Sequence, residues 1–200
     1  EPGITLIRAD PKHTEAILNF PTPTSTMSLR RFLGMTTFLQ KLVDHHACMA
    51  APLHELTKEG IEWHWNSEHE TALRNLKEAL ASQPFVALPN DHDPFVLRLD
   101  ASDTCLGGAL LQRTATGEKV IAYISRKFST TEQKWSTWEK ELYALVHSIK
   151  QYGYLFVCSD HPVTFISDHK PLRYWRTLDM VSDKVVRWMD TLNSIRVTML

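Results

Sequence analysis

The chain has 200 residues, 43% hydrophobic and 22% charged, which is enough for one large globular domain or two small ones. It contains no run of about 18 apolar residues, the length that a membrane-spanning helix needs, so we expect no membrane partner. The formal net charge of -1 lacks the basic excess typical of nucleic-acid-binding proteins. Any nucleic acid must therefore be bound by a local basic surface or by neighbouring segments.

The cysteines and histidines carry no recognisable metal or disulfide pattern. The cysteines lie far apart without a CxxC pair, at Cys48, Cys105 and Cys158. Such a sparse, odd count favours reduced thiols in an intracellular protein. Zinc-ligand spacing is absent from the histidines, for which we expect structural or surface roles: His45, His46, His64 and His69. Neither an initiator methionine nor a signal peptide opens the chain, which predicts a segment of a longer protein.

The first part of the chain, residues 1–60, predicts a small helical subdomain. Its prolines up to residue 27 indicate a connector with one short helix over residues 12–18. Ser28 is a candidate N-cap for an apolar pattern of helical spacing that reaches Val43. A further short helix is expected over residues 47–56.

Residues 61–93 predict a connecting segment. A strand or turn at residues 61–65 precedes an amphipathic helix that we expect to be capped by Ser67. Two prolines then bracket a short strand over residues 85–88, and a polar turn of Asn, Asp and His follows. We place the boundary of the next domain at residue 94.

Residues 94–200 alternate between strands and helices. Three β-prone runs separated by tight turns predict antiparallel hairpins, and a long helix follows them. The predicted strands are residues 95–100, 106–112, 119–125, 162–168 and 194–200, and the predicted helices are residues 130–151, 171–175 and 181–193. This order predicts an α/β fold, a mixed five-stranded sheet with flanking helices.

Glu141 is unusual because it lies on the apolar stripe of the long helix, between Trp138 and Leu145. Glutamate is rarely buried unless it is paired, so this position indicates a functional carboxylate. The alternative is an ordinary ion pair at the helix edge. Glu139 and Lys140 are predicted to point away from the stripe.

Two aspartates, Asp100 and Asp168, end predicted strands, where α/β folds often bind ligands. Alternatively, each serves a turn or caps a helix, as aspartate commonly does. If both meet Glu141, the three carboxylates repel each other unless cations neutralise them. Oxygen ligands suit Mg²⁺ or Mn²⁺, and two such ions about 4 Å apart can cleave a phosphodiester.

Several motifs resemble those of the reverse transcriptase and ribonuclease H of gypsy-type LTR retrotransposons. The segment that begins Leu97-Arg-Leu-Asp-Ala-Ser resembles the opening of their ribonuclease H domain, and Ile121-Ala-Tyr-Ile-Ser-Arg-Lys-Phe is similar to its third strand. Trp138-Glu-Lys-Glu-Leu resembles the helix whose second glutamate binds metal, and Phe165-Ile-Ser-Asp-His-Lys resembles the Thr-Asp-His-Lys motif. Upstream, Leu29-Arg-Arg-Phe-Leu-Gly and Pro52-Leu-His-Glu-Leu-Thr-Lys resemble the reverse-transcriptase thumb.

The resemblance implies a thumb-like subdomain, a connecting segment and a ribonuclease-H-like domain that cleaves the RNA strand of RNA–DNA hybrids. It implies Asp100, Glu141 and Asp168 as catalytic ligands of two Mg²⁺ or Mn²⁺ ions. It also implies fingers and palm upstream, integrase downstream, and a location in the cytoplasm or a virus-like particle. A fourth metal ligand of the family falls beyond Leu200, so the domain is expected to be truncated at its C-terminus. The polymerase motif Tyr-x-Asp-Asp is absent from the sequence.

Nucleic-acid contacts are expected from basic residues, although an ordinary solvated surface is the alternative for each. The candidates are Arg30, Arg31, Lys41, Arg126, Lys127, His169 and Lys170. Two other functions stay open. One is an inactive connection-type scaffold that binds the template–primer duplex, and the other is a decayed or domesticated relic of the element.

Overall fold

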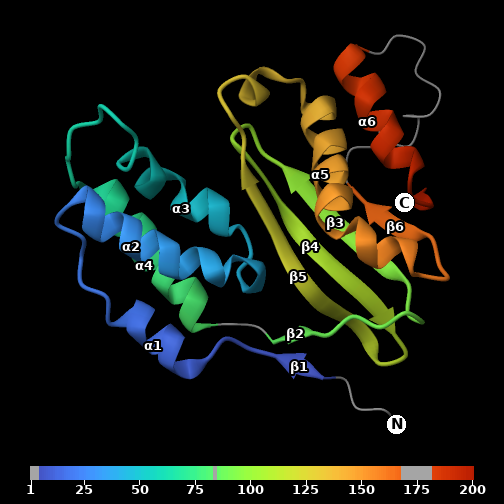
Figure 1. Cartoon of the computed structure of the whole chain (residues 1–200), viewed down its shortest axis with the longest axis horizontal. Coiled ribbons are helices and arrows are strands. Elements are labelled where there is room, and N and C mark those ends of the chain that lie inside the picture. Colours follow the sequence, from blue (N-terminus) through green and yellow to red (C-terminus); the bar gives the residue numbers. More distant parts are fainter. Residues whose placement is uncertain (1–4, 83–84, 168–181) are drawn as a thin grey trace.

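The computed structural model describes residues 5–82, 85–167 and 182–200. Figure 1 shows helices α1–α4 on one side of the larger sheet and helices α5 and α6 on the other. The first helices are α1 (Pro11–Leu18), α2 (Thr26–Phe38), α3 (His46–Glu55) and α4 (Ser67–Ala81), with a 3-10 turn, η1, at Gln40–Leu42. The short strands β1 (Leu6–Ile7) and β2 (Val86–Ala87) pair antiparallel below the helices.

The predicted mixed five-stranded sheet with flanking helices is confirmed. Its strand order is β5-β4-β3-β6-β7, with antiparallel pairs among the first three strands and parallel pairs from β3 to β6 and from β6 to β7. The strands are β3 (Phe95–Ala101), β4 (Cys105–Thr114), β5 (Gly117–Lys127), β6 (Val163–Ile166) and β7 (Val197–Met199). The remaining helical elements are η2 (Glu132–Lys134), α5 (Thr137–Val157) and α6 (Asp183–Asn193).

Several predicted boundaries are wrong by a few residues. Ser25, not Ser28, caps α2, and Asn66 instead of Ser67 caps α4. The long helix begins at Thr137 because Trp135 is extended and Ser136 then caps a new helix. The predicted strand or turn at residues 61–65 has no regular secondary structure. The predicted helix over residues 171–175 lies outside the described residues.

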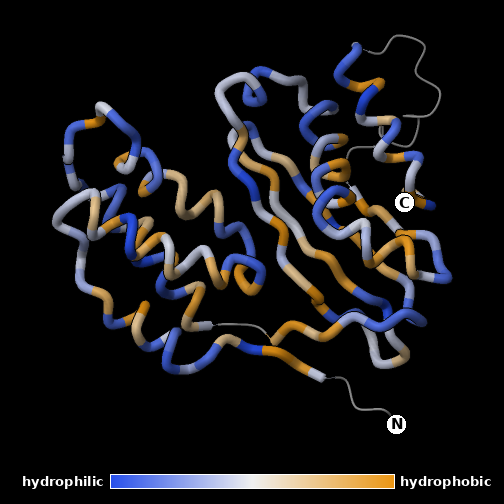
Figure 2. Tube along the Cα trace, viewed as in Figure 1, coloured by the Kyte–Doolittle hydropathy of each residue, from blue (hydrophilic) through white to orange (hydrophobic). Residues whose placement is uncertain are grey.

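Two separate clusters of buried hydrophobic residues stabilise the fold. One is formed by residues between Ala9 and Leu80, and the other by residues between Ala87 and Val197, where α5 packs on the sheet. Figure 2 shows hydrophobic residues along the strands of the larger sheet, whereas α5 alternates between hydrophobic and hydrophilic residues. This alternation lets one face of α5 cover the sheet. In the part of the chain that the structure describes, no helix combines the length and apolar character required to span a bilayer.

Candidate active site

Glu141 is held on the buried face of α5. The helix begins with a capping box in which the Ser136 side chain accepts from the Glu139 N–H and the Glu139 side chain accepts from the Ser136 N–H. Leu142 and Leu145, on the same face as Glu141, are fully buried in the larger cluster. Glu141 itself is only 2% exposed. The predicted burial of this carboxylate is therefore confirmed.

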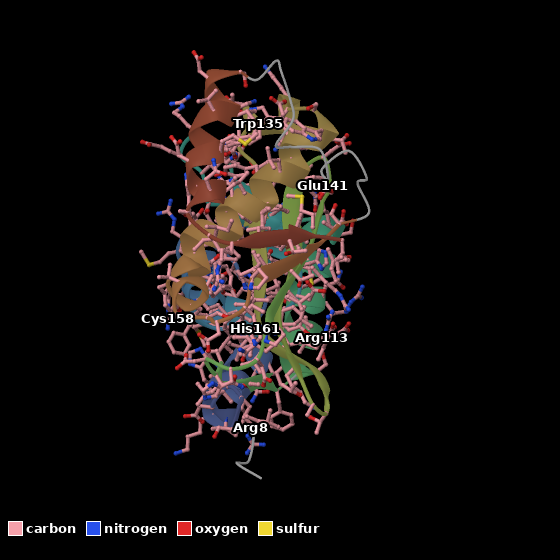
Figure 3. All side chains as sticks on the ribbon, turned by 90° about the vertical axis from the view of Figure 1, so that its right-hand side faces the viewer. Arg8, Arg113, Trp135, Glu141, Cys158 and His161 are labelled. Atoms are coloured by element: carbon pink, nitrogen blue, oxygen red, sulfur yellow. The ribbon has the colours of Figure 1, made fainter. Side chains whose placement is uncertain are left out.

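The carboxylate of Glu141 reaches the end of β3. The Ala101 N–H donates a hydrogen bond to Glu141 Oε1 at 3.0 Å. A backbone donor of this kind compensates part of the cost of burying a charge. Because Ala101 directly follows Asp100, this hydrogen bond joins α5 to the strand end at which Asp100 is exposed. Figure 3 shows Glu141 toward the same end of the molecule as Trp135, far from Arg8.

The third predicted carboxylate, Asp168, lies outside the described residues. The parallel pairing of β3 with β6 sets Arg98 opposite Ile166. In the sequence, Asp100 is two residues after Arg98, and Asp168 is two residues after Ile166. The structure thus brings Glu141 and the Asp100 strand end together, and the meeting of both with Asp168 stays a prediction.

A second contact from α5 fixes the turn after Asp100. The Lys140 side chain is only 4% exposed, and its ammonium forms an ion pair with Asp103 at 2.8 Å. This ion pair holds the pKa of the exposed Asp103 below its usual range. The turn is closed further by Ser102, whose N–H donates to the Cys105 carbonyl and whose hydroxyl accepts from the Cys105 N–H.

Lys140 therefore corrects the sequence prediction, which expected its side chain to point away from the buried stripe. Its aliphatic stem is buried while its charged end meets a carboxylate from the β3–β4 turn. In the sequence, only the position of Lys140 next to Glu141 could have indicated that it belongs to the site.

The donor chemistry at this end of the sheet suits a hard divalent cation, since the side chains of Glu141 and Asp100 supply carboxylate oxygens. Among the residues that the structure describes, however, no three His, Cys, Asp or Glu side chains are grouped closely enough to hold a metal ion. The two carboxylates are the kind of oxygen donors that such a set uses. Leu99 and Ala101 of β3 pack under α5, so the intervening Asp100 side chain starts from the opposite face of the strand, and its meeting with Glu141 and Asp168 at one ion stays a prediction.

The predicted nucleic-acid contacts divide into three groups. Arg30, Arg31 and Lys41 lie exposed in or near α2, although Arg30 also donates to the Thr57 carbonyl at 2.8 Å. Two others are engaged within the protein: Arg126 pairs with Glu132 at 2.9 Å, and Lys127 pairs with Glu55. The last two predicted contacts, His169 and Lys170, lie outside the described residues.

The family model of an RNase H-like domain found in reverse transcriptase matches residues 65–166. The retrovirus-related Pol polyprotein from transposon opus of Drosophila melanogaster is 35% identical over 195 residues, covering 91% of this chain and 19% of the polyprotein. The Gag-Pol polyprotein of feline leukemia virus is 31% identical over 155 residues, covering 78% of this chain and 9% of the polyprotein. The chain thus spans less than a fifth of the length of these relatives.

Solved structures share the fold. The structure of the foamy viral protease-reverse transcriptase in complex with RNA/DNA hybrid matches with a TM-score of 0.75 and 25% identity, covering 95% of this chain and 26% of that one. The structure of the foamy viral protease-reverse transcriptase dRH in complex with ds DNA matches with a TM-score of 0.79 and 24% identity, covering 96% and 35%. The second likeness concerns the fold alone.

Proposed function

Since the chain belongs to the family of RNase H-like domains found in reverse transcriptase, we propose that it hydrolyses the RNA strand of RNA–DNA hybrids with divalent metal ions. It would do so as part of a longer reverse transcriptase. The observation that carries this proposal is the buried carboxylate of Glu141, which accepts from the backbone N–H next to Asp100. A glutamate fixed in this way beside an exposed aspartate has the chemistry of a metal-binding nuclease site.

In this proposal Asp100, Glu141 and Asp168 hold two Mg²⁺ or Mn²⁺ ions. The ions, when bound, activate a water molecule and stabilise the leaving oxygen of the phosphodiester. Glu141 is the rigid ligand, because it is buried and hydrogen-bonded to the strand end. Asp100 is the ligand that solvent and substrate can reach. The Lys140–Asp103 ion pair keeps the turn after Asp100 in place.

The hybrid as substrate is supported by the foamy viral reverse transcriptase, which was solved with an RNA/DNA hybrid. We assign the contacts to the hybrid's backbone first to the exposed Arg30, Arg31 and Lys41. The gypsy type of the parent element is part of the proposal and rests on the sequence motifs. Fingers and palm upstream and integrase downstream are proposed on the same basis.

The proposal is tested by incubating the chain with a labelled RNA–DNA hybrid and Mg²⁺ and measuring the rate at which the RNA strand is cleaved. Loss of a metal ligand removes several kcal/mol of transition-state stabilisation, so we expect Asp100→Asn and Glu141→Gln to slow cleavage by about 100-fold or more. The matched controls are Asp91→Asn, in the exposed turn before β3, and Glu78→Gln, on the exposed face of α4. Equal cleavage by Asp100→Asn and Asp91→Asn would remove the proposed mechanism.

A non-catalytic, connection-type scaffold is the second candidate. It is supported by the family description, which names an RNase H-like domain of reverse transcriptase and no nuclease activity. Thermal unfolding with and without Mn²⁺ distinguishes the two functions, because a ligand that binds the folded state raises the melting temperature. A scaffold is expected to bind the duplex while its melting temperature stays the same with and without Mn²⁺.

A further inference from the structure

The start of α3 lies against the face of the larger sheet opposite α5. In β4 the intervening Leu106 is buried in the core under α5, so its neighbours Cys105 and Gly107 point to the other face. The strand register pairs Cys105 with Lys127 and Gly107 with Ser125, which places all four residues on that same face. This face is the one that the helical part of the chain contacts.

Three contacts fix α3 along this face. The His45 ring lies over Gly107, where an added β-carbon would be 2.8 Å from the ring. The Ala47 N–H donates to Ser125 Oγ at 2.6 Å. Near the other end of α3, Glu55 forms an ion pair with Lys127 of β5. Cys48 directly follows Ala47, and Cys105 is the partner of Lys127 in the sheet. Each cysteine is therefore next to a residue that holds α3 against the sheet.

These contacts place Cys48 of α3 next to the β4–β5 pair that contains Cys105. The Cys48 thiol is the largest cause of a lowered pKa at Cys105, to about 6, and the Cys105 thiol is the largest cause of a raised pKa at Cys48. Burial opposes the effect at Cys105, whereas Thr104 and the charges of Lys127 and His45 support it. The pairing therefore favours the loss of one proton from the two thiols, which produces a thiolate, the reactive form of cysteine.

Solvent reaches this pair from the Cys48 side. Cys105 is buried, but Cys48 is half-buried and lines an open pocket of about 410 Å³ between α3 and α4, together with Met49, Pro52 and Thr71. Hydrogen peroxide, a molecule with only two heavy atoms, is small enough to enter an opening of this kind. The third cysteine, Cys158, is exposed after the C-terminal end of α5 and provides an internal comparison.

We propose that Cys48 and Cys105 form a reversible disulfide when the protein meets hydrogen peroxide. The Cys48 sulfur attacks one peroxide oxygen and passes its proton to the Cys105 thiolate. The O–O bond breaks, hydroxide leaves, and Cys48 becomes a sulfenic acid. The Cys105 sulfur then attacks the Cys48 sulfur, its proton goes to the departing oxygen, and water leaves. Two thiols are oxidised by two electrons, and the peroxide is reduced to water once the hydroxide takes a proton from solvent.

The disulfide joins the two halves of the chain. Cys48 belongs to the helical part, whose buried residues lie between Ala9 and Leu80, whereas Cys105 belongs to the sheet. Oxidation thus replaces a non-covalent contact between the two hydrophobic clusters by a covalent one. A thiol such as glutathione or dithiothreitol reverses the reaction by exchange. This inference is independent of the nuclease function proposed above.

The experiment treats the reduced 200-residue chain with hydrogen peroxide, blocks free thiols by alkylation, and maps the peptides by mass spectrometry. We expect a linked peptide pair containing Cys48 and Cys105, with the mass of the monomer lower by two hydrogen atoms, while Cys158 is alkylated. Cys158→Ser should keep the link, and Cys48→Ser should lose it. Dithiothreitol should restore both thiols.

A second measurement does not depend on variants that fold. The same oxidation of the wild-type chain in concentrated urea should abolish the preference for the Cys48–Cys105 link, because the folded contacts create it. The proposal would be overturned if Cys48 and Cys105 of the folded protein were still reduced after peroxide treatment and therefore became alkylated. Links that involve Cys158 as often as Cys105 would overturn it too.

Discussion

Replacement of Gly108 by alanine tests the strand pairing that positions Asp100. Gly108 has φ +149°, a backbone conformation that L-residues rarely adopt, and it pairs with Leu99 of β3. An added β-carbon would overlap the Arg98 carbonyl oxygen and lie 2.9 Å from Leu99 Cα. Both contacts involve the neighbouring backbone, so relief requires β3 and β4 to move apart beside the site.

The cost follows from these two effects. A strained backbone conformation costs about 1–3 kcal/mol, and overpacking costs about 1–3 kcal/mol. We therefore expect Gly108→Ala to lower the free energy of unfolding by roughly 2–6 kcal/mol. With a urea dependence of about 2 kcal/mol per M, the unfolding midpoint should fall by roughly 1–3 M.

Two other glycines provide matched controls in the same urea experiment. Gly107→Ala meets only the ring of His45, a half-exposed side chain that can move, so its cost should stay below about 1 kcal/mol. Gly34→Ala lies in α2 with nothing within 4 Å and should stabilise the protein by about 0.5–1 kcal/mol. A Gly108 variant as stable as the Gly107 variant would refute the reasoning.

Two further predictions concern stability. Burial lowers the pKa of His46 to about 4, so the unfolded chain binds a proton first as the pH falls. The free energy of unfolding should therefore decrease by about 3 kcal/mol as the pH falls from 6.5 toward 4. His46→Gln should flatten this part of the pH profile of urea unfolding, whereas exposed His64→Gln should not; equal profiles for both would contradict the assignment. Leu145→Ala, at a fully buried position, should cost about 2–5 kcal/mol, and Val157→Ala, 72% exposed, less than about 0.5 kcal/mol in the same assay.

The sequence predicts the large elements well where hydrophobic periodicity dominates. The stripe through Leu142 and Leu145 identifies the helix that covers the sheet, and the two β-prone runs separated by a tight turn in residues 95–112 identify the first hairpin. The helix boundaries were harder to predict, because neighbouring residues compete to be the N-cap. Both Ser25 and Ser28 can cap a helix, and the structure uses Ser25, whose side chain accepts from the Ser28 N–H.

At the candidate site, a local rule was enough for Glu141 and failed for Lys140. A glutamate within an apolar stripe stands out in any helical pattern. A buried lysine is recognised only when its partner is known, and Asp103 reaches Lys140 from a turn 37 residues earlier. The contact between Cys48 and Cys105 depends in the same way on the packing of α3 against β4 and β5, which no local pattern encodes.

We propose that Asp100, Glu141 and Asp168 together bind divalent cations. Titration of the chain with Mn²⁺ by isothermal calorimetry tests it directly, with Asp100→Asn, Glu141→Gln and Asp168→Asn beside the Asp91→Asn control. We predict that the wild type and the control bind Mn²⁺ and that each of the three ligand variants loses or strongly weakens this binding. Mn²⁺ binding by Glu141→Gln as tight as that of the wild type, or no binding by the wild type, would contradict the account.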